Sequence, residues 1–457
     1  MKRNRISLIL VGSLLTAALA LGGCGNTAPA TPSDTSPTSA AASASTSAEA
    51  TPEATPEATP AKLVFLNGTA EMVDFWDNWF KAYNESNTDG ITVEHQFQKE
   101  ATKTLQVMMA SGSAPDLIAC SVTQDMLDNG KLVDLTDAGF WSTLNPAVKE
   151  FCTDAKSGRA FAVGTMQGAV GLYYNKAIFT ELGLKPANTW AEFVANLTVI
   201  HEKKPDIDPF YMGGKDGWML SHLAEYTFQA VAKQKLSYSA QQKAMLANDL
   251  ATLGWDASPD GALATLANDL SALKKDGLIN ANVVTATYDN QTTAFATGKA
   301  AVISQGIWAA GDIQKKNADT SFVGFCQYPA ILDGAKPAIG SGVDGLISLS
   351  AESTAKDAAM KVLEAILQPD TLKAISEARK APSANPAVTS DWGYLKDQVG
   401  QVLSDPSIAS VTWTTYPSGF TGDDSGRLFQ ELFAGKYAAP ADFAKAWTDA
   451  WMNGASK

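Results

Sequence analysis

The sequence predicts an α/β fold, because segments with a strand pattern alternate with segments whose apolar residues recur at helical spacing. Residues 61–68, 90–98 and 115–121 are short apolar runs typical of strands, and helix patterns at 71–85 and 102–113 lie between them. This alternation favours a parallel sheet with helices on its faces. Residues 62–457 exceed the usual size of one domain, so two lobes are expected.

Each element has its own local signal. The strand at 61–68 ends in Asn-Gly, and the helix at 102–113 is stopped by Gly112. Further along, 219–275 is mostly helical, and 294–308 gives a helix end, a short strand and a turn that leads to Trp308. Aromatic residues at helical spacing are expected in the core, and they are Phe75, Trp76, Trp79, Phe80, Tyr83, Phe429, Phe433, Phe443, Trp447 and Trp451.

The first 23 residues have the pattern of a secretory signal peptide. A basic start, "MKRNR", precedes an apolar run that ends in small residues, and Cys24 follows directly. The order resembles a bacterial lipobox, in which the thiol of Cys24 is acylated and anchors the protein to a membrane. We therefore expect a lipid-anchored protein on the extracellular face of a cell membrane, of Gram-positive type. An ordinary signal peptide with a chance cysteine is the alternative.

Residues 24–61 are expected to be a disordered tether. They are rich in Ser, Thr, Pro and Ala and hold no large apolar side chain before the strand begins, so they cannot bury enough surface to offset the entropy of ordering. Repeats of Thr-Pro-Glu-Ala add stiffness through proline and like charge.

Composition excludes several function classes. A net charge of −13 argues against a nucleic-acid partner, which needs a basic surface. Three cysteines remain after Cys24, so at least one thiol is free, and all three are expected to be buried. His95, His201 and His222 are far apart, which makes a metal site improbable, and no cofactor is expected. No nucleophile or phosphate-loop motif indicates an enzyme.

Five segments in one order resemble family 1 extracellular solute-binding proteins. They are "LQVMMASGSAPDLI" (105–118), "NGKLVDLTD" (129–137), "AFAVGTMQGAVGLYYNKAIFTELGLKPANTWAEF" (160–193), "AFATGKAAVISQGIW" (294–308) and "LFAGKYAAPADFAKAWTDAW" (432–451). The third is the most specific, with its Tyr-Asn-Lys and Thr-Trp-x-Glu. The family includes maltose-binding protein and the sugar-binding lipoproteins of ABC importers. One departure is Gly164, where the family often has proline; this glycine could widen the hinge or the site.

The resemblance implies a two-lobe, periplasmic-binding-protein-like (class II) fold with a hinge between the lobes. The first lobe would comprise 62–168 and 345–402, and the second 169–344 and 403–457. The implied function is that of a receptor which captures a mono- or oligosaccharide in the cleft between the lobes. It would then deliver the sugar to the permease subunits of an ABC transporter, without catalysis.

Sugar rings stack on aromatic faces, and their hydroxyls need planar polar partners. Trp308, at a turn after a strand, is the first candidate, and in sugar binders that resemble this chain this tryptophan is a stacking floor. Trp218 and Asp216 share a Gly-rich stretch that could hold a ring face and a hydroxyl together. Trp413 is a further candidate that could equally be a packed strand residue, and Trp190 is expected to be structural.

Polar candidates come from strand ends and crossings. Asn67 and Thr69 follow the first strand, where ligands of open α/β sheets bind, although Thr69 could instead cap the next helix. Gln167 lies where the chain is expected to cross between lobes. Asp344 is the only charged residue of a Gly-rich stretch and could also be a turn residue. Arg379 could reach the edge of the cleft, but it is expected to form an exposed salt bridge.

Two other functions stay open. A protein of the same fold could bind a polyamine, peptide or phosphate ester, which would need acids with aromatics for a cation or Arg and Lys for an anion. A secreted glycan-active enzyme would need two carboxylates that face the cleft, and the adjacent Asp423 and Asp424 are the pair to examine.

Overall fold

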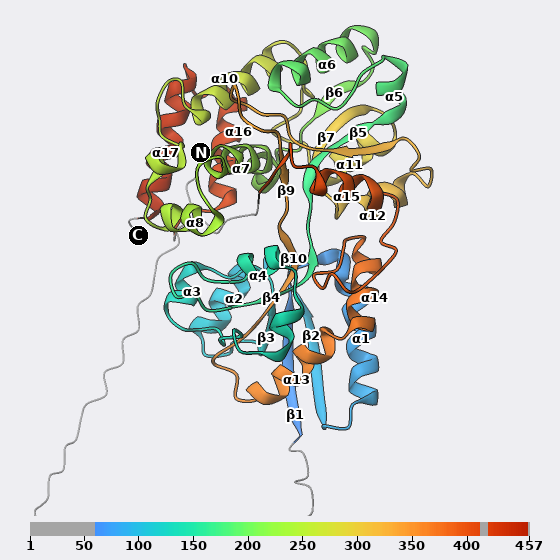
Figure 1. Ribbon diagram of the computed structural model, residues 1–457, viewed down its shortest axis with the longest axis vertical. Helices are drawn as coiled ribbons and strands as arrows, with labels where there is room; N and C mark the ends of the chain where they lie inside the picture. The colour runs from blue at the N-terminus through green and yellow to red at the C-terminus, as the bar shows by residue number, and fades with distance from the viewer. Residues whose placement is uncertain (1–59, 412–418, 456–457) are drawn as a thin grey trace, which may run out of the picture. The chain divides into compact units, whose positions relative to one another are not determined.

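The computed structural model describes residues 60–411 and 419–455 (Figure 1). The expected signal peptide, Cys24, nearly all of the expected tether and Trp413 lie outside these residues. Within them the protein has two mixed β-sheets surrounded by helices, so the expected α/β class is confirmed. No helix of these two ranges has both the length and the apolar character needed to cross a membrane.

The first sheet has the strand order β2-β1-β3-β10-β4. Its strands are β1 (Ala61–Asn67), β2 (Ile91–Phe97), β3 (Leu117–Ala119), β4 (Val163–Gln167) and β10 (Val343–Leu349). The first three are parallel, as predicted, but β10 runs antiparallel between β3 and β4. The sheet as a whole is mixed, because β10 joins it from a distant part of the chain.

The second sheet has the order β11-β9-β5-β7-β6, and β8 also pairs with β5. Its strands are β5 (Val170–Asn175), β6 (Asp208–Tyr211), β7 (Ala300–Gly306), β8 (Val323–Cys326), β9 (Ala338–Gly340) and β11 (Ala409–Val411). β6 and β7 are parallel, whereas β5 is antiparallel to β7, β8 and β9. Parallel β6 and β7 bring their carboxyl ends to one edge of this sheet.

The α-helices of the described ranges include those predicted at 71–85, at 102–113 and within 219–275. They are α1 (Val73–Ser86), α2 (Ala101–Ala110), α3 (Gln124–Asp128), α4 (Pro146–Phe151), α5 (Lys176–Glu181), α6 (Trp190–Lys203), α7 (Gly217–Lys233), α8 (Tyr238–Leu246), α9 (Leu250–Leu253), α10 (Ala262–Lys275), α11 (Tyr288–Ala296), α12 (Ala309–Lys316), α13 (Lys356–Ile366), α14 (Pro369–Arg379), α15 (Lys396–Ser404), α16 (Gly422–Phe433) and α17 (Pro440–Ala455). Two short 3-10 helices, η1 (Ala70–Met72) and η2 (Gly139–Thr143), accompany them.

Aromatic residues explain why several helices lie where they do. On α1, Trp76 and Phe80 are buried against Phe65 of β1, with ring centroids 4.9 and 4.8 Å from it. On α17, Trp447 and Trp451 stack on each other at 5.3 Å and are fully buried. Burying a large aromatic side chain stabilises the fold by about 1.5–3 kcal/mol, so these faces hold α1 on β1 and α17 against neighbouring helices.

Two of the places where the chain passes between the sheets are adjacent. It leaves the first sheet after Gln167 and enters the second at Val170, and it returns between Gly340 and Val343. The two crossings are held together, because the N–H of Gly168 donates to the carbonyl of Gly342 at 2.8 Å. In Figure 1 the green and orange-brown crossing segments run side by side between the sheets.

Gly164 has a packing role. A β-carbon at this position would lie 2.3 Å from a methyl group of Val343 and 3.0 Å from one of Val148. The glycine thus lets β4 and β10 approach each other closely, and neighbouring side chains fill the space beside it. The expectation that Gly164 widens the hinge or the site is wrong.

The thiols are free, as predicted, and burial keeps them protonated. Cys152 and Cys326 are buried, whereas Cys120 is half-buried, which corrects the expectation for that residue. Burial raises the pKa of the Cys120 and Cys326 thiols to about 12 each. A protonated thiol is a poor nucleophile and metal ligand. The two described ranges also contain no cluster of three or more His, Cys, Asp or Glu suited to a metal ion.

Candidate ligand-binding site

A cavity of about 160 Å³ opens at the carboxyl ends of β1 and β3, beside β10. Asn67, Thr69 and Asp344 line it, so three of the sequence-predicted residues share one space. Its other lining residues are Met72, Trp76, Ala119, Cys120, Ser121, Thr165, Met166, Val343, Gly345, Leu346 and Ile347. This position agrees with the rule that ligands of α/β sheets bind beyond the carboxyl ends of strands.

Asn67 and Thr69 have different roles in this cavity. The side chain of Asn67 is buried, and its amide holds a turn by accepting from the N–H of Thr69 at 2.8 Å and donating to the Thr69 carbonyl at 3.0 Å. Thr69 precedes η1, but its hydroxyl makes no capping hydrogen bond. The alternative role of Thr69 as a helix cap is therefore not realised, and Asn67 presents the Thr69 side chain to the cavity.

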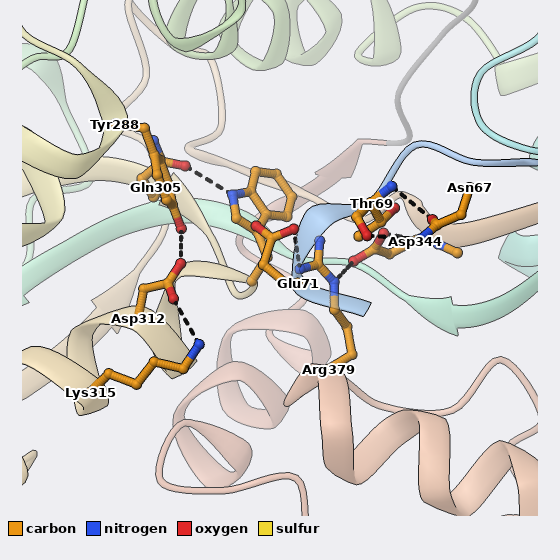
Figure 2. Close-up of polar contacts among 11 residues, drawn as sticks. Asn67, Thr69, Glu71, Tyr288, Gln305, Asp312, Lys315, Asp344 and Arg379 are labelled. Atoms are coloured by element: carbon orange, nitrogen blue, oxygen red, sulfur yellow. Dashed lines mark hydrogen bonds and ion pairs between the residues drawn. The ribbon is translucent and has the colours of Figure 1, made fainter. Parts of the chain in front are cut away.

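A buried arginine lies beside this cavity. The Nε of Arg379 donates to Asp344 at 2.9 Å, and one of its terminal nitrogens lies 3.4 Å from Glu71. Only 7% of the Arg379 side chain is exposed, so the expectation of an exposed salt bridge is wrong. Burial alone would lower the pKa of Arg379, but the Asp344 and Glu71 charges raise it above its usual value. Figure 2 shows Arg379 between the two carboxylates.

The sequence left Asp344 open between a ligand contact and a turn residue, and it gave no sign that Arg379 is its partner. One of its oxygens accepts from Arg379, and the other accepts from the N–H of Gly345 at 2.8 Å. Glu71 keeps about a third of its side chain exposed while it faces the arginine. Glu71 therefore combines a fixed orientation with access to solvent, which a group that accepts hydrogen bonds from a ligand requires.

Trp308 and Trp218 meet at the end of the second sheet. Trp308 precedes α12, and Trp218 lies in the first turn of α7 rather than in the loop before it. Their ring centroids are 6.5 Å apart, and the His222 ring lies 5.7 Å from Trp308 and 5.1 Å from Trp218. Both tryptophans are half-buried, so each offers part of its surface to solvent. The structure thus brings the two predicted aromatic residues into one cluster.

Trp308 is held from several sides. Its indole Nε1 donates to the side-chain oxygen of Gln305 at 3.1 Å. The six-membered ring lies against Gly306, where a β-carbon would come within 2.1–2.3 Å of three ring atoms. Trp308 also packs against both buried apolar clusters of the protein. It is therefore a fixed wall of the site that keeps an open surface.

Tyr288 belongs to the aromatic cluster of Trp308 and Trp218 and also interacts with the carboxylates of Asp312 and Glu71. Its ring centroid lies 6.1 Å from that of Trp218, and its hydroxyl donates to Asp312 at 3.1 Å. Burial raises the pKa of Tyr288, and the charges of Asp312 and Glu71 raise it further. The negative charge of Glu71 thus acts on the Tyr288 hydroxyl and favours its protonated form. Figure 2 places Glu71 and Arg379 between Tyr288 and Gln305 on one side and Thr69 and Asp344 on the other.

Two other predicted residues, Asp216 and Gln167, lie outside the lining of the first cavity. Asp216 is exposed at the N-cap position of α7, where its side chain makes no capping bond. Gln167 is half-buried at the end of β4, and its backbone N–H donates to Pro382. Neither residue lines the cavity beside β1. Both remain close in sequence to elements that do form the site, because α7 carries Trp218 and β4 pairs with the strand of Asp344.

A second groove of about 350 Å³ continues from the first and shares Thr69, Cys120 and Ser121 with it. It is also lined by Gly68, Lys99, Glu100, Ala101, Thr102, Lys103 and Asp423. Asp423 comes from α16, whereas the others come from segments of the first sheet and α2. Sequence reasoning did not find this groove, since exposed lysines at a helix start have no distinctive local signal.

The adjacent acids Asp423 and Asp424 face different partners. Asp424 belongs to a capping box, in which it accepts from the N–H and the hydroxyl of Thr421 while its own N–H donates to Thr421. Asp423 alone reaches the second groove. The two carboxylates are therefore not arranged as the acid–base pair of a glycan-cleaving site.

Burial of His222 is expected to make the stability of the folded protein depend on pH. Burial lowers the pKa of His222 from 6.5 to about 3, so the unfolded chain binds a proton below pH 6.5 that the folded protein does not take up. Stability should then fall as pH drops from 6.5 toward 3, by up to about 1.4 kcal/mol per pH unit. His222→Gln should remove this component in chemical denaturation at several pH values. His201→Gln, at an exposed histidine, is the control, and equal pH profiles for both variants would contradict the prediction.

Several known proteins are similar in sequence to this chain. Residues 69–373 match the family model described as bacterial extracellular solute-binding protein. The chain is 27% identical over 343 residues to the melibiose/raffinose/stachyose-binding protein MelE of Bacillus subtilis, covering 75% of this chain and 77% of MelE. It is 28% identical over 260 residues to the multiple sugar-binding protein of Streptococcus mutans, covering 56% and 59%.

Solved structures share the fold. A binding protein of Bacillus subtilis in an open conformation matches with a TM-score of 0.73 and 23% identity, covering 87% of this chain and 98% of that one. RafE in complex with raffinose matches with a TM-score of 0.68 and 20% identity, covering 85% and 99%. With a family model that spans most of its length, this chain belongs to the bacterial extracellular solute-binding proteins.

Proposed function

We propose that this protein is an extracellular carbohydrate receptor of an ABC importer, which captures a mono- or oligosaccharide and delivers it to the membrane permease. One observation carries the proposal. The half-buried tryptophans 308 and 218 form an aromatic wall, and Glu71, fixed by Arg379, lies close to Tyr288 of that cluster. An aromatic face next to a fixed carboxylate suits the C–H face and the hydroxyls of a sugar.

The binding site in this proposal lies between two lobes. The first lobe comprises 62–168 and 345–402, the second 169–344 and 403–457, and the paired crossings near Gly168 and Gly342 act as the hinge. Trp308, Trp218 and Tyr288 would bind the ring faces, and Thr69, Glu71 and Asp344 would bind hydroxyls. Other proposed contacts are Asp216, Gln167, Asn67 and Trp413. Asn67 acts chiefly by holding the turn of Thr69.

The sugars in the names of the relatives set the first ligands to test. MelE is named for melibiose, raffinose and stachyose, and solved neighbours hold raffinose and stachyose. We infer that this chain binds saccharides of this size, because the cavity beside β1 continues into the second groove. In this proposal one ring stacks on Trp308 and Trp218, outside the lining of both spaces, and further rings extend into the first cavity and toward Lys99 and Asp423 of the second groove.

A thermal-shift screen of the purified chain tests the proposed function. The panel contains melibiose, raffinose, stachyose and common monosaccharides, with spermidine, a short peptide and glucose 6-phosphate as non-sugar or charged alternatives. A saccharide at 100 times its dissociation constant should add about 2.7 kcal/mol of stability. A shift with spermidine, the peptide or the phosphate ester alone would contradict the carbohydrate assignment. Incubation of any stabilising saccharide with the protein, followed by chromatography, tests for turnover, and a cleaved product would favour the enzyme alternative.

The membrane anchor is a separate proposal that depends on Cys24 and its lipobox. Acylation of the Cys24 thiol would hold the protein at the outer face of the cell membrane without a spanning helix. Cys24→Ala should therefore move the protein from the membrane fraction to the medium or the soluble fraction. The measurement is an immunoblot of fractionated cells, with Cys120→Ala as the matched control. A Cys24→Ala protein that stays in the membrane fraction would contradict the anchor.

A further inference from the structure

A chain of buried side-chain amides leads from the core of the second sheet to Trp308. The indole Nε1 donates to the oxygen of Gln305 at 3.1 Å, the nitrogen of Gln305 donates to the oxygen of Gln291 at 2.8 Å, and the nitrogen of Gln291 donates to the carbonyl of Tyr211 at 2.9 Å. Gln305 and Gln291 are 0% and 1% exposed. Three elements take part, since these residues lie on β7, α11 and the end of β6.

The direction of this chain is fixed by its two ends. An indole N–H can only donate, and a backbone carbonyl can only accept. Gln305 must therefore turn its oxygen to Trp308, which leaves its nitrogen for Gln291. Gln291 must in turn accept from Gln305 and donate to Tyr211. Each amide therefore has one orientation that satisfies both of its neighbours. By accepting from the nitrogen of Gln305, Gln291 keeps the oxygen of Gln305 turned toward Trp308.

We infer that Gln291 and Gln305 are positioning residues that hold the Trp308 indole in its ligand-binding orientation; this inference rests on the proposed function. Gly306 and both apolar clusters pack against the ring, but apolar contacts do not direct its N–H. The hydrogen bond from Nε1 supplies a directional restraint, and burial of both glutamines makes a broken link costly. A ring fixed before the ligand arrives loses less entropy when the ligand binds.

Gln291→Met provides a test at a distance, because Gln291 is hydrogen-bonded to Gln305, which in turn accepts from Trp308. The substitution keeps the approximate length of the side chain and removes both hydrogen bonds. With raffinose as the probe in calorimetry, affinity should fall by about three- to tenfold. The loss should nearly vanish in a Trp308→Phe background, where no indole N–H remains to be oriented. Equal losses in both backgrounds would overturn the inference.

Gln327→Met is the matched control. Gln327 is also a buried glutamine, and it donates to Ala187 and Asn188 rather than to this chain of amides. We expect Gln327→Met to lower the melting temperature as Gln291→Met does, yet to leave the raffinose affinity unchanged. A comparable loss of affinity in Gln327→Met would show that a general loss of stability explains the effect, and would overturn the positioning role.

A spectroscopic readout separates this inference from the choice of sugar. In ¹⁵N-tryptophan-labelled protein, the indole resonance of Trp308 is the one absent from Trp308→Phe. Gln291→Met should shift that resonance and speed its hydrogen exchange, and Gln327→Met should not. An unchanged Trp308 resonance in Gln291→Met would overturn the inference even if raffinose binds. If raffinose does not bind the wild-type protein, the raffinose proposal fails, and the indole resonance still decides the positioning role.

Discussion

Arg379→Leu should lower the free energy of unfolding by about 3–5 kcal/mol, because it leaves two carboxylates without their buried counter-ion. Arg379 is 7% exposed at its side chain, and its partners Asp344 and Glu71 lie 2.9 and 3.4 Å away. Leucine fills part of the volume but cannot satisfy either carboxylate. Urea denaturation followed by circular dichroism measures the change.

Arg427→Leu is the control for this prediction. Arg427 also pairs with a carboxylate, Glu431, at 2.8 Å on α16, but half of its side chain is exposed. Such a pair contributes at most about 1 kcal/mol, since water solvates both charges when the pair is broken. If Arg379→Leu cost no more than Arg427→Leu, the buried ion pairs would not be stabilising the protein. Recovery of part of the loss in Arg379→Leu/Asp344→Leu would support the unpaired carboxylate as its cause.

The position of Arg379 gives its ion pairs a role in the proposed hinge. Asp344 lies at the start of β10, directly after the crossing between the sheets, and Glu71 lies in η1 at the edge of the first cavity. One guanidinium on α14 therefore connects the crossing strand to the segment that presents Thr69 and Glu71. A ligand hydroxyl that donates a hydrogen bond to Glu71 acts on a group that is coupled to this crossing.

Much of the fold could be predicted from local patterns. The strand at 61–67 and the helix that follows it were readable because Trp76 and Phe80 recur at helical spacing and are buried against Phe65. The mixed character of the first sheet could not be read in this way. β10 pairs with β3 through Ser348 and Ile118, and no local signal in either segment specifies a partner so distant in the chain.

The parts of the candidate site that could be predicted are those in which a single residue has a distinctive local sequence context. A tryptophan at a strand-to-helix turn and one beside a Gly-rich stretch pointed to the aromatic cluster, and the structure brings Trp308 and Trp218 together. Arg379 was misjudged, because the polar residues around it in "SEARKAPSANP" suggest a solvated surface. Its burial depends on Glu71 and Asp344, which come from other parts of the chain. Gln291 and Gln305 were missed because their hydrogen-bond partners also come from other parts of the chain.

Trp308→Ala should weaken binding of a stabilising saccharide by about 2 kcal/mol or more, because a stacking face and its buried apolar area are lost together. Isothermal titration calorimetry gives the change directly. Trp308 also packs against both apolar clusters, so some loss of stability is expected as well. Affinity must therefore be measured well below the melting temperature of the variant.

Two further variants separate stacking from general damage. Trp79→Ala removes another half-buried tryptophan, which stacks on Tyr83 at 5.3 Å on the first-sheet side of the protein. It should cost stability and leave the affinity unchanged. Trp308→Phe keeps an aromatic face but removes the Nε1–H that Gln305 accepts, so its loss should fall between wild type and Trp308→Ala. If Trp308→Ala binds saccharide as tightly as wild type, the ring is part of the core only. The wall of the site would then have to come from Trp218 and Tyr288, whose rings lie 6.1 Å apart and would lose a neighbour in that variant.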